Sequence, residues 1–225
     1  PLEYSVNTVN LIAYTNGDAV AMDFGNMDAV IVWEGISLID NRTPIVVIAT
    51  GIQKATANGK TGAMVQTWII RSDLHPMEAV KGRVDGGICG GCEHRTQEDG
   101  SRSCYVAVWQ APRAIYMKYT RGGYPVAQTG DLAAIFAGRH VRLGSYGDPA
   151  AVPVAVWAAM LTDAAGHTGY THQWKSPRLR DVLQFCQASA DTEADAERLA
   201  TEIGAGYFRV KSPDAPVLPG EIVCP

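Results

Sequence analysis

Hydrophobic and polar positions alternate in short runs along the first part of the chain. Residues 20–24 and 29–33 form such runs, and turn-forming Gly, Asn and Asp residues separate them. A two-residue period interrupted by turn residues predicts β-hairpins. Residues 45–49 instead form a continuous apolar, largely β-branched run, which predicts a buried strand. We therefore expect an N-terminal β-rich segment over residues 1–44 and an α/β domain over residues 45–225.

Strand-like and helix-like periods alternate through the rest of the chain. Strands that alternate with helices imply parallel pairing through right-handed crossovers, so the predicted fold class is α/β. Both a partial or irregular (β/α) barrel and an open parallel sheet satisfy this pattern. The predicted strands are 64–71, 105–109, 141–146, 168–172, 185–190 and 207–210, and the predicted helices are 75–80, 112–119, 129–136, 154–161, 177–184 and 193–203.

Polar side chains follow three of the predicted strands directly. Asp148, His172 and Asp191 occupy these places, and ligands in α/β folds collect at the carboxyl ends of strands. They are the candidate catalytic residues. Capping is the alternative for both aspartates, since Asp148 precedes a helix beginning near Val152 and Asp191 precedes one beginning at Glu193.

Three cysteines with the spacing C-x2-C-x11-C predict a metal-binding knuckle over residues 87–105. They are Cys89, Cys92 and Cys104, and the two glycines between the first pair free the backbone for a tight turn. His94 or Cys224 completes the set, and strain after Cys92 slightly favours Cys224. Zinc is the expected metal, with a [4Fe-4S] cluster as the alternative. A disulfide or inert buried thiols would also fit the pattern.

Charge is distributed unevenly along this chain, whose net charge is −4. Residues 113–180 carry eight Lys and Arg against three Asp and Glu. A basic segment within an acidic protein indicates a phosphate-bearing ligand, although a solvated surface is the simpler alternative. Arg142, Lys175 and Arg178 are the candidate phosphate-binding residues, and Tyr146 or Trp174 is expected to stack on a base.

Cellular location and completeness follow from the ends of the chain and its apolar runs. No run reaches the roughly 18 residues of a membrane span, so no membrane partner is expected. A cysteine cluster without a visible signal peptide indicates a reducing cytoplasm, which favours metal over disulfides. A chain that ends at Cys224-Pro225 is expected to be a fragment truncated at its C-terminus.

Several ordered motifs from about residue 45 onward resemble a group of phage and prophage proteins of unassigned function, one branch of which is known from mycobacteriophages. The motifs are Lys60-Thr61-Gly62, Cys89/Cys92/Cys104-Tyr105, Ser145-Tyr146-Gly147-Asp148, Gly169-Tyr170-Thr171-His172 and Cys224-Pro225. In such relatives further cysteines follow the Cys-Pro pair, and this chain lacks them. The resemblance implies a bacterial cytoplasm as the location.

The combination of a metal site with strand-end aspartates is also distantly similar to tRNA-guanine transglycosylases and their phage relatives that place 7-deazaguanines in DNA. The transglycosylase zinc spacing, C-x-C-x2-C, is not present here. The leading hypothesis is a nucleic-acid-modifying enzyme of the base-exchange type, with Asp148 attacking the sugar and Asp191 moving a proton. An iron–sulfur redox or radical-type protein and a non-enzymatic zinc-binding phage protein are the alternatives.

Overall fold

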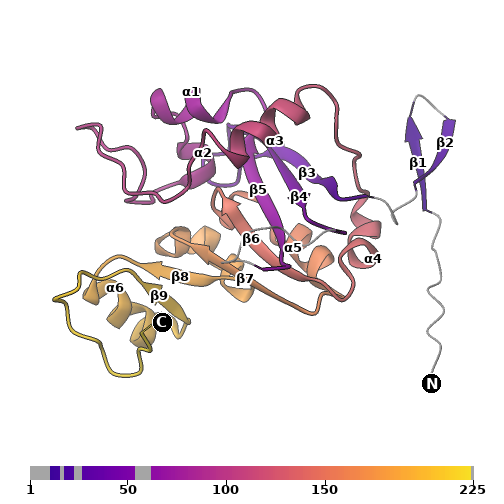
Figure 1. The fold of residues 1–225 in the computed structure, drawn as a ribbon. Coiled ribbons are helices and arrows are strands. Elements are labelled where there is room, and N and C mark those ends of the chain that lie inside the picture. The colour runs from indigo at the N-terminus through magenta and orange to yellow at the C-terminus, as the bar shows by residue number, and fades with distance from the viewer. Residues whose placement is uncertain (1–10, 16–17, 23–26, 54–61, 224–225) are drawn as a thin grey trace, which may run out of the picture.

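The structure is a computed structural model that describes residues 11–15, 18–22, 27–53 and 62–223. Within these ranges seven strands form one sheet in the order β3-β4-β5-β6-β7-β8-β9 (Figure 1). β1 and β2 pair with each other as a separate antiparallel hairpin. The strands are β1 (Leu11–Thr15), β2 (Asp18–Met22), β3 (Ala29–Ile36), β4 (Pro44–Thr50), β5 (Val65–Arg71), β6 (His140–Tyr146), β7 (Gly166–Thr171), β8 (Gln187–Ala190) and β9 (Tyr207–Arg209).

The sheet is mixed but mostly parallel. β4 runs antiparallel to both β3 and β5, and every pair from β5 to β9 is parallel. Residues 45–49 of β4 are each at most 1% exposed, because the sheet is covered on both faces at this position. The α/β class and the buried strand are therefore confirmed. Within the described ranges β9 and β3 are the two edges of the sheet, so the open sheet is the correct architecture and the barrel does not close.

The expected boundary at residue 44 falls inside this sheet. β3 pairs with β4 from Ala29 opposite Thr50 to Ile36 opposite Pro44. The end of the β-rich N-terminal segment thus supplies an edge strand to the same layer that carries the parallel strands.

Helical segments connect the parallel strands, and the longest connection runs from β5 to β6. Figure 1 shows that this connection carries α1 to α4 and a loop after α2 that extends away from the sheet. The helices are α1 (Pro76–Lys81), α2 (Gly86–Cys89), α3 (Ala111–Tyr119), α4 (Leu132–Phe136), α5 (Val154–Leu161) and α6 (Glu193–Arg198). Shorter 3₁₀ segments cover Thr129–Asp131, Pro149–Ala151, Gln173–Lys175 and Pro177–Gln184, and a π-helical turn covers Leu199–Ile203.

The strand predicted over residues 105–109 is wrong. This segment has no regular structure up to residue 107, although Val108 is buried and Tyr105 and Trp109 are 77% and 62% exposed. The segment therefore buries Val108 without forming a strand. β5 and β6 pair directly with each other, so this segment does not lie between them as a strand.

Candidate metal centre

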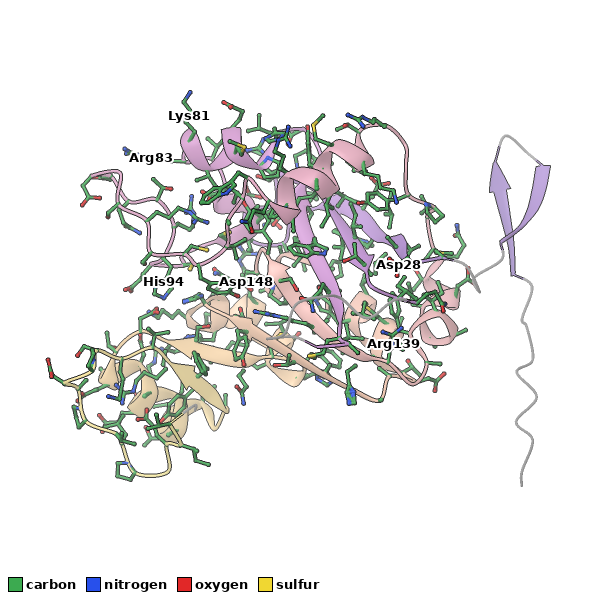
Figure 2. The ribbon with its side chains drawn as sticks, viewed as in Figure 1. Asp28, Lys81, Arg83, His94, Arg139 and Asp148 are labelled. Atoms are coloured by element: carbon green, nitrogen blue, oxygen red, sulfur yellow. The ribbon has the colours of Figure 1, made fainter. Side chains whose placement is uncertain are left out.

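A cavity of about 490 Å³ lies at the carboxyl ends of β6, β7 and β8. Asp148, His172 and Asp191 line it from the strand side, and Cys92 and His94 line it from the loop after α2. Figure 2 shows His94 and Asp148 close together between this loop and the strands. The cavity lies at the edge of the sheet where α/β folds form ligand sites, and where the sequence predicts the strand-end residues.

Asp148 follows β6 through a turn that requires glycine. Gly147 has φ +81°, and a Cβ at this position would lie 2.6 Å from the carbonyl oxygen of Ile69. The turn places the Asp148 carboxylate inside the protein, where the residue is only 6% exposed. Burial raises the pKa of Asp148, and the hydrogen bonds that its carboxylate accepts oppose this rise.

Both carboxylate oxygens of Asp148 are occupied by protein donors. Oδ1 accepts from the backbone N–H of Ala150 at 2.9 Å and the hydroxyl of Thr171 at 2.7 Å. Oδ2 accepts from the backbone N–H of His172 at 2.9 Å and the side-chain amide of Gln173 at 3.2 Å. Asp148 therefore caps the 3₁₀ segment Pro149–Ala151 and joins the ends of β6 and β7. No oxygen remains free for attack on a substrate in this arrangement.

Asp191 has a different environment at the end of β8. Its side chain is 8% exposed, and its Oδ1 lies 3.3 Å from Nε2 of His172 and 3.5 Å from Nε2 of His94. Its Oδ2 is buried and has no hydrogen-bond partner among the described residues. Lys175 Nζ lies 4.0 Å from this oxygen, beyond hydrogen-bond distance. Thr192 caps α6 by accepting from the backbone N–H of Asp195, so Asp191 is not the cap.

His94, His172 and Asp191 form a candidate metal-binding group. One donor atom from each lies within 4.8 Å of the other two, and no other such group occurs in the described ranges. The other ring nitrogen of His94, Nδ1, lies 2.8 Å from the hydroxyl of Ser103. Metal-ligating histidines commonly bond in this way through the nitrogen that does not bind the metal, which fixes the ring orientation.

The three cysteines of the predicted knuckle all line the same cavity as free thiols. Gly90 follows Cys89 with φ +56°, and a Cβ there would lie 2.2 Å from the side-chain amide of Gln173. That amide accepts from the backbone N–H of Gly91 at 3.3 Å and donates to the carbonyl of Cys89 at 3.2 Å. The turn between Cys89 and Cys92 is thereby attached to the end of β7, as its glycines permit.

Burial raises the pKa of two of these thiols. Burial raises the pKa of Cys92 to about 11. The pKa of Cys89 rises well above its usual value, first through burial and then through Asp85 and the neighbouring thiols. The shared cause is burial, which disfavours the charged thiolate form of both residues.

The predicted phosphate-binding cations do not gather at one place. Arg142 lines the cavity and donates to the hydroxyl of Tyr105 at 2.8 Å. Lys175 lies within salt-bridge distance of Glu93, Asp191 and Asp195. Arg178 donates to the backbone carbonyls of Leu38 and Ile39 and does not line this cavity.

The two aromatic residues predicted to stack on a base are both buried. Tyr146 is 2% exposed but still lines the cavity. Trp174 is fully buried in a small cluster with Ala188, Ala190, Ala196 and Leu199. Its indole N–H donates to the carbonyl of Ser189 at 2.7 Å, so the ring has no face open to a ligand.

The aromatic side of the cavity was not predicted from the sequence. Tyr105, Tyr170 and Phe208 line it, and Tyr170 and Phe208 contact each other with ring centroids 5.3 Å apart. They come from the loop, β7 and β9. The sequence signal that could have indicated these three residues is that each is an aromatic residue at an outward-facing position of a predicted strand. Cys224 lies outside the described residues, and His94 is part of the histidine–aspartate group.

Comparisons with protein-family models, with curated proteins and with solved structures return no match to this chain. No helix in the described ranges is both long and apolar enough to span a membrane. The function is therefore inferred from the cavity and its side chains.

Proposed function

We propose that this protein is a metal-dependent enzyme in which His94, His172 and Asp191 hold a catalytic metal ion in the wall of the cavity. The observation that carries the proposal is the convergence of two imidazole nitrogens and one carboxylate oxygen within 4.8 Å. Ligand atoms about 2.1 Å from one ion in tetrahedral geometry lie roughly 3.4 Å apart. The distances from Asp191 Oδ1 to the two histidines, 3.3 and 3.5 Å, fit this spacing.

The second oxygen of Asp191 supports a cation at this place. A buried carboxylate oxygen without a partner carries an uncompensated desolvation cost of about 1–3 kcal/mol. Direct hydrogen bonds from both histidines to Oδ1 would explain the two short distances but would leave Oδ2 without a partner. A metal ion beside the carboxylate offsets the charge on both oxygens, so it accounts for the whole arrangement.

Two histidines and one carboxylate leave coordination positions open for water or substrate. A bound ion supplies Lewis-acid chemistry, since it polarises a substrate oxygen or lowers the pKa of a bound water. Asp148 positions His172 by accepting its backbone N–H. The cavity volume of about 490 Å³ suits a small molecule or a single extruded nucleotide. Arg142 and Tyr105, which line the cavity, would bind an anionic substrate group.

Base exchange on nucleic acid stays a prediction, with changed roles for its residues. Asp148 has four protein donors on its carboxylate, so a nucleophilic role would require these hydrogen bonds to break. Asp191 is better placed to bind metal than to move a proton. Of the three predicted cations, Arg142 is the one that lines the cavity and has no carboxylate partner in the described ranges. Salt-dependent binding of single-stranded DNA would support this mechanism.

Titration with Mn²⁺ tests the metal site, because this ion favours nitrogen and oxygen ligands over thiolates. Electron paramagnetic resonance measures the free ion, and relaxation of water protons measures exchangeable water on the bound ion. Wild-type protein should bind Mn²⁺ with water still attached, as an open catalytic site requires. His94→Ala, His172→Ala and Asp191→Asn should each lose most of this binding.

His140→Ala is the matched control, since His140 is exposed at the start of β6 and does not line the cavity. It should bind Mn²⁺ as wild type does. Wild-type affinity in all three cavity variants would overturn the proposed site. Bound Mn²⁺ without exchangeable water would show a closed structural ion and would overturn the catalytic role.

A further inference from the structure

We propose that the cavity binds a nucleoside monophosphate, whose aromatic base stacks on Tyr170 and Phe208 and whose phosphate is held by Arg142. This assignment rests on the proposed function, since it takes the cavity as the active site, and it names the chemical class of the substrate. That class is a planar heteroaromatic ring joined to a phosphate through a sugar. A free nucleotide and a nucleotide within a single strand share this chemistry.

Two aromatic rings from the far end of the sheet form one wall of the cavity. Tyr170 comes from β7 and Phe208 from β9, on either side of β8. Their ring centroids lie 5.3 Å apart, and their planes are inclined by 58°. Both residues line the cavity, yet Tyr170 is 37% exposed and Phe208 is 42% exposed. Aromatic faces that stay open inside a cavity can stack on a base, because every base has a π-face.

Strand register places this aromatic pair beside the histidine–aspartate group. Tyr170 precedes His172 by two residues at the end of β7. Phe208 pairs with Ser189 of β8, which precedes Asp191 by two residues. Residues two apart on a strand face the same side and lie about 6–7 Å apart. A base that stacks on the pair therefore lies next to the candidate metal ligands.

Arg142 lies further from the histidine–aspartate group than the aromatic pair does. It pairs with Thr168 of β7, which precedes Tyr170 by two residues. Two residues along and one strand across place the Cα of Arg142 roughly 8 Å from that of Tyr170. An anionic group at Arg142 and a ring on the aromatic pair therefore need a spacer between them. The sugar of a nucleotide supplies such a spacer.

The guanidinium group of Arg142 is available to an anion. Its Nη2 donates to the hydroxyl of Tyr105 at 2.8 Å, and its side chain has no carboxylate partner among the described residues. The described acidic residues that line the cavity are Asp148 and Asp191, and both contact His172 at the opposite end. A guanidinium group forms paired hydrogen bonds to phosphate oxygens. The charges of the cavity therefore place the phosphate at Arg142.

Simpler ligands leave part of this wall unused. An apolar molecule would leave Arg142 without an anion, and a sugar phosphate would leave Tyr170 and Phe208 uncovered. The cavity volume of about 490 Å³ lies within the range of about 300–1,000 Å³ that is typical of small-molecule sites. Single exposed aromatic residues are common on protein surfaces, and Trp109, which is 62% exposed outside the cavity, is one of them. Trp109 is therefore a control for the aromatic pair.

Calorimetric titration with three probes tests the two halves of the ligand separately. Deoxyadenosine 5′-monophosphate carries base and phosphate, deoxyadenosine lacks the phosphate, and deoxyribose 5-phosphate lacks the base. In protein treated with EDTA, the monophosphate should bind at least about tenfold more tightly than either fragment, because stacking and a charged hydrogen bond each contribute about that factor. A fragment that binds as tightly as the monophosphate, or no binding of the monophosphate, would overturn the proposal.

Variants assign each half to its residue. Arg142→Ala should bind the monophosphate about tenfold more weakly and deoxyadenosine as wild type does. Phe208→Leu keeps an apolar side chain without a ring, and it should weaken the monophosphate and deoxyadenosine by about the same factor, fivefold to tenfold. Arg113→Ala and Trp109→Leu are the controls, since both residues are exposed outside the cavity, and they should match wild type. Wild-type affinity for the monophosphate in either cavity variant would overturn the proposed placement.

A measurement on the wild-type protein avoids variants that fail to fold. Saturation-transfer nuclear magnetic resonance reports which protons of a bound ligand lie closest to the protein. The base protons of deoxyadenosine 5′-monophosphate should receive more saturation than its sugar protons, because the base contacts the aromatic wall. Stronger transfer to the sugar than to the base would overturn the stacking.

The source of the nucleotide is read from one further probe, a single-stranded deoxyadenosine pentamer with a 5′-phosphate. Tighter binding of the pentamer than of the monophosphate, with a steep dependence on salt, would support a nucleotide within a strand. Tighter binding of the monophosphate would support a free nucleotide.

Mn²⁺ binding separates this inference from the proposed metal site. Arg142→Ala and Phe208→Leu should bind Mn²⁺ as wild type does, because neither residue belongs to the histidine–aspartate group. Failure of the nucleotide tests with intact Mn²⁺ binding would overturn the substrate class alone. Nucleotide binding by a wild-type protein that does not bind Mn²⁺ would support the substrate class and overturn the catalytic metal.

Discussion

The carboxyl ends of β6 and β8 each present a buried aspartate to the same cavity, but the two carboxylates differ in their partners. Asp148 accepts four hydrogen bonds from the protein. Asp191 faces two histidines with one oxygen, and its other oxygen has no hydrogen-bond partner among the described residues and lies 4.0 Å from Nζ of Lys175. From the sequence alone, each of the two aspartates could be either a helix cap or a functional group. The structure assigns the capping interaction to Asp148 and leaves Asp191 available to a ligand.

This difference shows how burial should be interpreted at a strand end. Burial alone raises the energy of any charged carboxylate, so both residues need compensation. The protein supplies this compensation to Asp148 through four hydrogen bonds, and the metal ion that we propose would supply it to Asp191.

Asp148→Ala should give the largest effect, a fall of about 3 kcal/mol in the free energy of unfolding. Removal of the carboxylate leaves buried donors without an acceptor, each at a cost of about 1–3 kcal/mol, and water from the cavity relieves part of this cost. Denaturant unfolding of the metal-free protein measures it. Asp191→Ala should cost about 1 kcal/mol or less, and exposed Asp163→Ala should stay within about 0.5 kcal/mol. Equal losses for Asp148 and Asp191 would remove the contrast.

Asp191→Asn should abolish the stabilisation that a metal ion gives. At a free Mn²⁺ concentration of about 100 times Kd, binding to the native state adds about 2.7 kcal/mol to the free energy of unfolding. Wild type should show this increase and the variant should show none. Asp163→Asn serves as the control for loss of one negative charge, and it should gain as much stability from Mn²⁺ as wild type. An undiminished gain in Asp191→Asn would place the ion elsewhere.

Local pattern was sufficient to predict most of the fold. The apolar run in β4 and the alternation of helical and strand periods after residue 140 each depend on neighbours in the sequence, so the α/β class follows from them. Closure of the sheet depends on whether β9 meets β3, and no local pattern carries that information. The segment 105–109 shows the same limit, because its apolar run resembles a strand but a strand also needs a pairing partner.

The location of the candidate site could be predicted from the sequence, but the role of each residue in it could not. Cys92, His172 and Asp191 stood out because their residue types follow turns or strand ends, and all three line the cavity. Two of the hydrogen bonds that occupy the Asp148 carboxylate come from Thr171 and Gln173, which lie more than 20 residues further along the chain. The sequence alone therefore does not show which of the two aspartates has its oxygens occupied by protein donors. The burial of Trp174 likewise depends on packing beneath α6, which periodicity does not specify.

Gly90→Ala should cost about 1–3 kcal/mol of stability. The positive φ at this position strains any other residue, and the added Cβ would displace the Gln173 amide that joins the cysteine turn to Asp148. Gly91→Ala is the matched control, since no atom lies within 4 Å of its Cβ position and its φ is not positive. The two variants should therefore differ clearly in thermal unfolding. Similar behaviour would show that the turn adapts and that the link to β7 is unimportant.

Lys175→Ala should have the smallest effect, a gain of roughly three- to tenfold in Mn²⁺ affinity at low salt with little change in stability. Lys175 Nζ lies 4.0 Å from the unpartnered oxygen of Asp191, and its charge repels a divalent ion at that place. Its side chain is 43% exposed, and exposed ion pairs contribute only about 0–1 kcal/mol, so removal should hardly affect folding. Lys81→Ala is the control, because Figure 2 shows Lys81 at the end of α1, away from His94 and Asp148. The gain should diminish as salt screens the charge. An affinity that falls instead would show that Lys175 supports Asp191 as a ligand rather than competing with the metal.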